Sequence, residues 1–398
     1  MAITLEAHQV PWVSTGSAAS QPVVARKRPE YLFIHTVRFW AMAAIVFIHS
    51  ADAFRKYGPV SLAENAVMVQ AFKFGTIGFF IISGFLVGDR LPASDPLGYL
   101  RRRAHRLVPA WALWFGLWVL YTTGRDLLET HGTGIRLDVV ASMVEKNSIN
   151  CLTWTPLWFI PNFLVALTCV VMLRRWLNDL RLGAVLLAVN IFYGVNVYTR
   201  WLPSRHTEAL FGFVFYLWLG AWCAGRKQGI QDWACARSPW WLSFWACVAA
   251  GIAIWEITVL AAHNSPDPLN SLRFGNQLYS VLIVILLVRI RRRTWPSFIN
   301  VAETTYGVYL IHAVVMIVVF SAAMKILLVH GHDLGPAGVL LIWALLAPTV
   351  YFLSLQLTRS LAGSQRWGWA VGASNFSLRK FISPATSEDA PLRQPAEA

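Results

Sequence analysis

Long apolar runs constrain the fold of this chain more than any other feature. Runs close to the length of a membrane span cover residues 31–52, 67–88, 106–123, 156–173, 182–198, 209–224, 240–262, 274–290, 301–328 and 337–358. An α-helix needs roughly 20 mostly apolar residues to cross a hydrocarbon core of about 30 Å. Only 14% of the residues are charged, against about 25% in an average soluble domain. The sequence therefore predicts an all-α, polytopic helical bundle with about ten transmembrane helices.

The distribution of Lys and Arg predicts the orientation of these spans. If the N-terminus lies inside, 23 of the 34 basic residues fall in cytoplasmic segments and nine on the opposite side. Arg38 and Lys73 fall inside spans and complete the count. Cytoplasmic loops carry such an excess of basic residues, so both termini are expected in the cytoplasm. The net charge of +14 then reflects topology, and we expect no nucleic-acid partner.

The chain divides into one membrane domain and two tails. Residues 1–30 are expected to form a cytoplasmic N-terminal tail, and the first apolar run an uncleaved signal anchor. Residues 31–363 are expected to form a single transmembrane domain. Residues 364–398, rich in Ser, Pro, Ala and Glu, are expected to form a disordered cytoplasmic tail. The five cysteines include no C-x-x-C pair, so no metal site is predicted.

Two ionisable residues in the first predicted span, Arg38 and His49, are the strongest candidates for chemistry. Ionisable groups inside a membrane are costly, and by default they mark functional sites. Eleven residues at about 100° each bring the two side chains to within about 20° of one another on the helix, roughly 16 Å apart along its axis. Arg38 is then expected toward the cytoplasm and His49 toward the outer side.

Four further segments carry polar or aromatic residues in distinctive patterns. The run FFIISGFL holds Ser83 and Gly84, whose small size lets another helix approach closely. The run RRRAHRLVP holds Arg103 and Arg106 on one helix face, a spacing suited to gripping a polyphosphate, although positive-inside anchoring also explains its charge. The other two segments are LWFIP, which begins at Leu157, and YGVYLIH, which ends at His312.

Together these motifs resemble those of the acyltransferase-3 family of bacterial integral-membrane O-acyltransferases. The resemblance spans residues from about 31 to 315, with all five motifs in the family's order. It rests on Arg38, His49, Phe79, Phe80, Ser83, Gly84, Phe85, Arg102, Arg103, Arg106, Pro109, Leu157, Trp158, Phe159, Tyr306, Tyr309 and His312. Two positions depart from the pattern. Ile77 stands where the family often has an acidic residue, and Leu107 replaces the usual Ile, a trivial change.

The resemblance implies a membrane-bound O-acyltransferase of the bacterial cytoplasmic (inner) membrane. Acyl-CoA, expected to be acetyl-CoA, would be the donor substrate. The acceptor would be a hydroxyl of a carbohydrate or glycolipid, such as a cell-surface polysaccharide, and no permanently bound cofactor is expected. His49 and Arg38 would be catalytic, and the donor would be bound by Arg102, Arg103 and Arg106. Expected to line the cavity are Asp52, Ser83, Trp158, Tyr309 and His312.

Several alternatives remain open at the level of sequence. A transporter or flippase would use Arg38 and His49 to bind substrate or relay protons, and a lipid or amine could replace the sugar acceptor. Asp52 either orients the His49 imidazole or is a solvated acid at the end of the span, the second being favoured. His312 either lines the cavity or makes a structural hydrogen bond. The sequence does not fix the oligomeric state.

Overall fold

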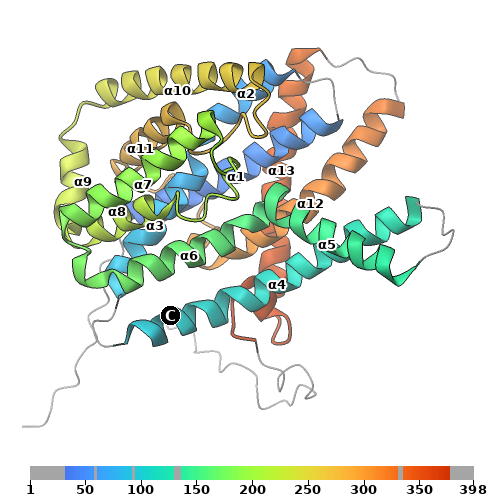
Figure 1. Ribbon diagram of the computed structural model, residues 1–398, viewed down its shortest axis with the longest axis horizontal. Coiled ribbons are helices and arrows are strands. Elements are labelled where there is room, and N and C mark those ends of the chain that lie inside the picture. Colours follow the sequence, from blue (N-terminus) through green and yellow to red (C-terminus); the bar gives the residue numbers. More distant parts are fainter. Residues whose placement is uncertain (1–31, 58–60, 92–94, 130–135, 330–334, 377–398) are drawn as a thin grey trace, which may run out of the picture. The chain divides into compact units, whose positions relative to one another are not determined.

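The computed structural model describes residues 32–57, 61–91, 95–129, 136–329 and 335–376, and within these ranges it contains helices and no strand. The predicted all-α class is therefore confirmed. The predicted N-terminal tail, 1–30, and residues 377–398 of the predicted C-terminal tail lie outside the described residues. The helices (Figure 1) are α1 (Leu32–Tyr57), α2 (Leu62–Gln70), α3 (Gly75–Arg90), α4 (Pro96–Glu129), α5 (Leu137–Trp154), η1 (Pro156–Trp158), α6 (Phe159–Met172), η2 (Arg174–Trp176), α7 (Leu180–Thr199), α8 (Val214–Ala224), α9 (Lys227–Cys235), α10 (Pro239–Ala262), α11 (Phe274–Val288), α12 (Val301–Val329), α13 (Pro336–Ala362) and η3 (Gly368–Val371).

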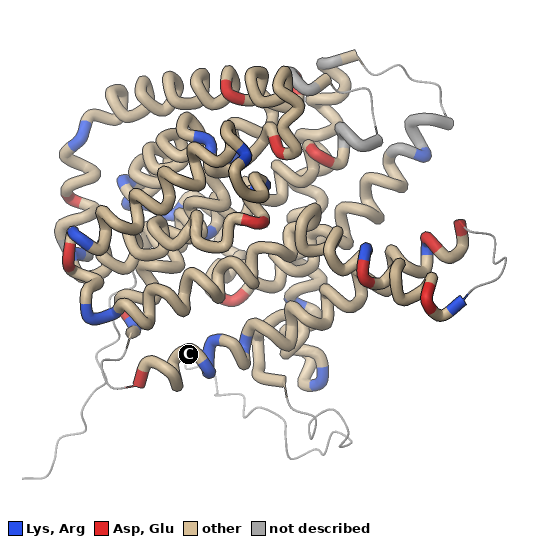
Figure 2. The backbone as a smooth tube through the Cα atoms, viewed as in Figure 1, with Lys and Arg blue, Asp and Glu red and all other residues tan. Residues whose placement is uncertain are grey.

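Among the described residues, seven helices are long and apolar enough to cross a membrane. The pair α5 and η1–α6 raises this number to eight if it counts as one span, although its two parts are bent by 78°. The predicted number of about ten is larger because the apolar helices α8 and α11 have only 11 and 15 residues. Figure 2 shows the charged residues near helix ends and in connecting segments, as expected when helix centres face lipid or pack together.

The bend between α5 and α6 lies at the LWFIP segment. Thr155 has an extended backbone there, which is the conformation favoured before a proline, and Pro156 has no N–H to continue the helix. The Thr155 hydroxyl accepts a hydrogen bond from the backbone N–H of Leu157 at 3.2 Å. Trp111 Nε1 donates to the Leu157 carbonyl at 2.9 Å, and the Tyr309 hydroxyl donates to the Pro156 carbonyl at 2.6 Å. The bend is therefore held from both α4 and α12.

Helices α3 and α8 pack closely through glycines. A Cβ on Gly84 would lie 1.9 Å from the Leu217 carbonyl oxygen, and one on Gly220 would lie 1.9 Å from the Ile81 carbonyl oxygen. Neither position therefore has room for a side chain. Of the predicted small-residue pair Ser83–Gly84, Gly84 lets a second helix approach at backbone distance, as the sequence predicts.

The first part of the predicted C-terminal tail contains the short helix η3, which packs against α4. Trp114 Nε1 on α4 donates to the Ala370 carbonyl at 2.9 Å, and Arg106 Nε donates to the Gly372 carbonyl at the same distance. Gly372 has a positive φ of 70°, which ends η3 in a left-handed turn. Residues 364–376 thus bring the chain back beside the basic segment of α4.

Candidate functional site

A strongly basic cavity of about 460 Å³ lies beside the start of α4. Five arginines contribute to its wall, and none of the described residues that line it is acidic. The lining consists of Arg90, Tyr99, Arg101, Arg102, Arg103, His105, Arg106 and Asn375. The three arginines predicted to bind an anionic donor thus face one cavity, which we call the inner cavity.

Protein contacts orient each of these three guanidinium groups. Arg102 Nη1 forms an ion pair with Asp95 at 3.1 Å, and Arg103 Nε donates to the Tyr99 hydroxyl at 3.2 Å. The bond from Arg106 Nε to the η3 segment holds the third. Because a guanidinium has five N–H donors, each arginine is oriented and still has N–H groups to offer to an anion.

Arg38 lies on α1 on the side of the inner cavity but does not line it. Its side chain is half-buried, and Nη2 donates to the Ala302 carbonyl on α12 at 3.3 Å. The charges of Arg90, Arg103 and Arg106 lie close enough to act on Arg38. The Arg38 side chain thus adds positive charge behind the wall of the inner cavity.

A second cavity, of about 660 Å³, opens further along α1 and contains His49. We call it the outer cavity. Its wall comes from α1, α4, α5, η1, α12 and the segments that connect α2 to α3, α7 to α8 and α10 to α11. The two cavities share no lining residue, and α1 runs past both. The predicted separation of Arg38 and His49 along one helix is therefore matched by two chemically different cavities.

The ring that lies beside His49 belongs to His312, on α12. The two ring centroids are 5.5 Å apart. His312 is fully buried, and its Nδ1 lies 2.6 Å from the Tyr309 carbonyl oxygen, so Nδ1 carries a proton and donates it. Asp52 lines the outer cavity and accepts a hydrogen bond from Asn65 at 3.5 Å.

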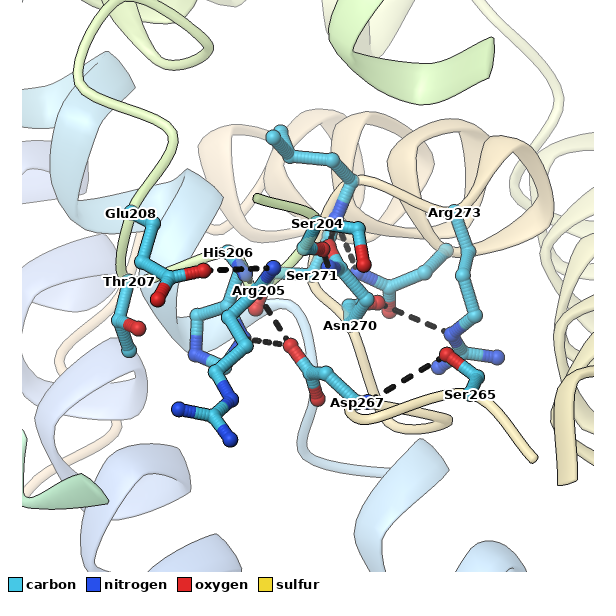
Figure 3. Close-up of polar contacts among 12 residues, drawn as sticks. Ser204, Arg205, His206, Thr207, Glu208, Ser265, Asp267, Asn270, Ser271 and Arg273 are labelled. Carbon is cyan, nitrogen blue, oxygen red and sulfur yellow. Dashed lines mark hydrogen bonds and ion pairs between the residues drawn. The ribbon is translucent and has the colours of Figure 1, made fainter. Parts of the chain in front are cut away.

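A hydrogen-bonded pair that sequence analysis missed, His206 and Asp267, also lines the outer cavity (Figure 3). The His206 Nδ1 and backbone N–H both lie within reach of the same Asp267 oxygen, at 2.5 and 3.1 Å. Burial alone would raise the pKa of the Asp267 carboxyl. The charge and hydrogen bonds of His206, together with nearby Lys73, outweigh burial and hold this pKa at about 2. Asp267 is therefore ionised at neutral pH.

The structure brings together only part of the predicted site. Asp52 and Trp158 line the outer cavity with His49, whereas Ser83, Tyr309 and His312 do not belong to its lining. Ser83 lies beside the α3–α8 contact, and Tyr309 holds the bend at Pro156. Three more cavity residues, His206, Asp267 and the buried Lys73, come from connecting segments far apart in the sequence. No motif or spacing marks His206 and Asp267, apart from the flanking prolines of Asp267, which indicate a constrained loop. Lys73 is marked in the sequence only by its place inside a predicted span.

Comparison with known proteins assigns the chain to a family. A family model described as an acyltransferase domain, that of the acyltransferase-3 family, matches residues 31–359. No curated protein and no solved structure gave a significant match. The matched region includes every predicted site residue and both cavities except Asn375.

Proposed function

Because the chain belongs to the acyltransferase-3 family of membrane acyltransferases, we propose that it carries an acyl group from cytoplasmic acyl-CoA to an acceptor hydroxyl. The expected acyl group is acetyl, and the expected acceptor is a carbohydrate or glycolipid at the outer face of a bacterial cytoplasmic membrane. The observation that carries this proposal is the position of α1, with Arg38 beside a basic cavity and His49 in a separate cavity.

The inner cavity suits the nucleotide head of acyl-CoA. That head carries phosphates, and the oriented N–H groups of Arg102, Arg103 and Arg106 can donate charge-assisted hydrogen bonds to them. The pantetheine arm is long and flexible, so the thioester can extend from the head along α1. We infer that Arg38 stabilises the donor on this path, which covers about 16 Å to His49.

His49 is the proposed general base. Its imidazole takes the proton of the acceptor hydroxyl while the hydroxyl oxygen attacks the thioester carbonyl carbon. A C–O bond forms, the C–S bond breaks, and the proton passes from His49 to the departing CoA sulfur. The products are an ester and free CoA, and His49 is neutral again. General-base help contributes typically about 10²–10⁴-fold, and holding the two substrates in position accounts for much of the remaining rate enhancement.

The proposed function also requires a particular membrane topology. We infer that the short apolar helices α8 and α11 cross the membrane with the eight longer candidates, which gives about ten spans and places both termini in the cytoplasm. Basic residues 226–237 then lie on the side of the inner cavity. The outer cavity opens to the opposite side, where a surface glycan is accessible.

Two measurements test this function together. Mass spectrometry of surface glycans from a deletion strain should reveal the loss of one O-linked ester and its return on complementation. Purified protein in nanodiscs should release CoA from acetyl-CoA only when the de-esterified glycan is present. Movement of glycan across vesicles without acyl-CoA, with no ester formed, would contradict acyl transfer and favour a flippase.

A further inference from the structure

We propose that the wall of the outer cavity around His206 and Asp267 binds the acceptor, and that His206 forms a hydrogen bond with one of its hydroxyls. The acceptor would be a hydroxyl-rich ring such as a sugar. This inference rests on the proposed function and extends it, because it identifies the site at which the second substrate is held. His206 is here a binding residue, Asp267 a positioning residue, and His49 keeps the role of base.

The contact between His206 and Asp267 fixes which ring nitrogen faces the acceptor. An ionised carboxylate only accepts hydrogen bonds, so His206 Nδ1 carries the proton and donates it to Asp267 Oδ2. Nε2 then faces a ligand as an acceptor when the ring is neutral and as a donor when the ring is charged. The side chain is 19% exposed and lines the outer cavity, and Nε2 has no protein partner among the described residues. A hydroxyl that enters this cavity can therefore form a hydrogen bond with Nε2.

Aromatic rings and an arginine surround His206. Trp158 lies edge-to-face with the imidazole at 5.0 Å between centroids, and Arg205 lies over the Trp154 ring at 4.0 Å. Both tryptophans and Arg205 line the outer cavity. The Arg205 Nε is buried and has no hydrogen-bond partner among the described residues. Apolar rings with a few polar groups that fix orientation are typical of small-molecule sites, and they suit the CH face and hydroxyls of a sugar ring.

The wall is built as a rigid unit from two connecting segments (Figure 3). Asn270 Nδ2 donates to the Ser204 carbonyl at 2.7 Å, and Asn270 Oδ1 accepts from the Leu272 backbone at 2.8 Å. Arg273, fully buried, donates from Nε to the Asn270 carbonyl at 2.9 Å. The Asn270–Ser204 bond and the His206–Asp267 contact join the α10–α11 segment to the α7–α8 segment, and the other two bonds hold the α10–α11 segment itself. A site held in place before binding loses less entropy when it binds.

The inner cavity suits the donor, and the outer cavity suits the acceptor. Charges of both signs line the outer cavity, from Asp52, Asp267, Lys73, Arg125 and Arg205, whereas no described acidic residue lines the strongly basic inner cavity. A polyphosphate head therefore has a more uniformly positive site in the inner cavity. A neutral polyol needs acceptors as well as donors, and the mixed charges of the outer cavity offer both.

The test separates acceptor binding from donor binding. Purified protein in nanodiscs is assayed with acetyl-CoA and with surface glycan freed of its esters by mild alkali, each varied in turn. Replacing His206 with Leu should raise the acceptor KM by roughly 2- to 10-fold, because one net hydrogen bond is lost, and leave the KM for acetyl-CoA unchanged. His206→Gln, whose amide can donate and accept hydrogen bonds, should restore part of the loss. Asp267→Asn should raise the acceptor KM several-fold through His206.

His263→Leu is the matched control, because His263 is exposed at the end of α10 and lines neither cavity. It should leave both KM values unchanged. Binding of CoA to each variant reports whether the fold survives. An acceptor KM of His206→Leu equal to that of the parent, with CoA binding intact, overturns the inference while leaving acyl transfer in place. A parent protein that forms no ester overturns the proposed function, and this inference with it.

Discussion

The imidazole rings of His49 on α1 and His312 on α12 lie 5.5 Å apart, measured between their centroids. His49 belongs to the lining of the outer cavity, whereas His312 is fully buried behind it. His312 Nδ1 donates to the Tyr309 carbonyl, and its Nε2 has no hydrogen-bond partner among the described residues. The two histidines are neighbours with different surroundings, and we expect different roles.

His312→Gln should therefore lower the rate of acyl transfer less than a change at His49. The buried ring packs beside the proposed base and does not itself face the cavity, so its loss should disturb the position of His49 without removing the base. The rate constants of the two Gln variants, measured in parallel at saturating donor and acceptor, check this. A loss at His312 as large as that at His49 would place His312 in the proton transfer itself.

Replacing Arg103 and Arg106 together with Gln should raise the KM for acyl-CoA by roughly 10-fold or more. Hydrogen bonds to charged groups are worth about 1.5–3 kcal/mol each, and both arginines face the inner cavity. Expression and insertion should survive, because Arg101 and Arg102 still supply positive charge on that side. Donor affinity is measured by titration of CoA against the purified variant. An unchanged affinity would assign this arginine pair to topology alone.

Gly84→Ala should destabilise the protein, because the new Cβ would lie 1.9 Å from the Leu217 carbonyl oxygen of α8. Forcing extra atoms into a packed interface costs about 1–3 kcal/mol. The thermal unfolding midpoint in detergent should fall. Gly116→Ala is the control, since no atom lies within 4 Å of its added Cβ, and Ala favours a helix by up to about 1 kcal/mol. Equal midpoints for the two variants would mean that α3 and α8 are not in backbone contact.

Cysteine labelling tests the proposed orientation. In a background whose five native cysteines are replaced by Ser, Asp138→Cys and Gly229→Cys each offer one exposed position. A membrane-impermeant maleimide added to intact spheroplasts should label Asp138→Cys and leave Gly229→Cys unlabelled. Permeabilisation should then label both. The reverse pattern would place the inner cavity outside and contradict a cytoplasmic donor.

The sequence predicts the helices well because membrane spans need long apolar runs. Each predicted run overlaps a helix, and the run 156–173 covers η1 and α6, whereas α5 lies between two predicted runs and is not part of any predicted span. The short helices α8 and α11 and the bent pair α5 and α6 leave the number of spans at seven or eight. The bend itself follows from Pro156 and Thr155, but its 78° depends on contacts from Trp111 and Tyr309. Those contacts join residues far apart along the chain, where no local pattern reports them.

The candidate site, like the fold, could be predicted from the sequence only in part. Arg103 and Arg106 share a helix face, and Arg38 and His49 share another, so helical periodicity alone places each pair on one face of its helix. His206 and Asp267 are 61 residues apart on two connecting segments, and no periodicity links them. Tyr309 and Ser83 were expected to line the cavity. Instead, Tyr309 holds the bend at Pro156, and Ser83 lies beside the contact between α3 and α8. Sequence alone does not reveal whether a polar or aromatic residue in a motif faces a cavity or a neighbouring helix.

The most direct test of acyl transfer at His49 is the rate of His49→Gln. Gln can replace a packing hydrogen bond, but it cannot take a proton near neutral pH. The variant is purified, its insertion and its binding of CoA are verified, and ester formation is measured with acetyl-CoA and de-esterified glycan. We expect CoA binding like that of the parent and a loss of transfer on the order of 10²-fold or more. Transfer at close to the parental rate would contradict the catalytic assignment and make His49 a structural residue.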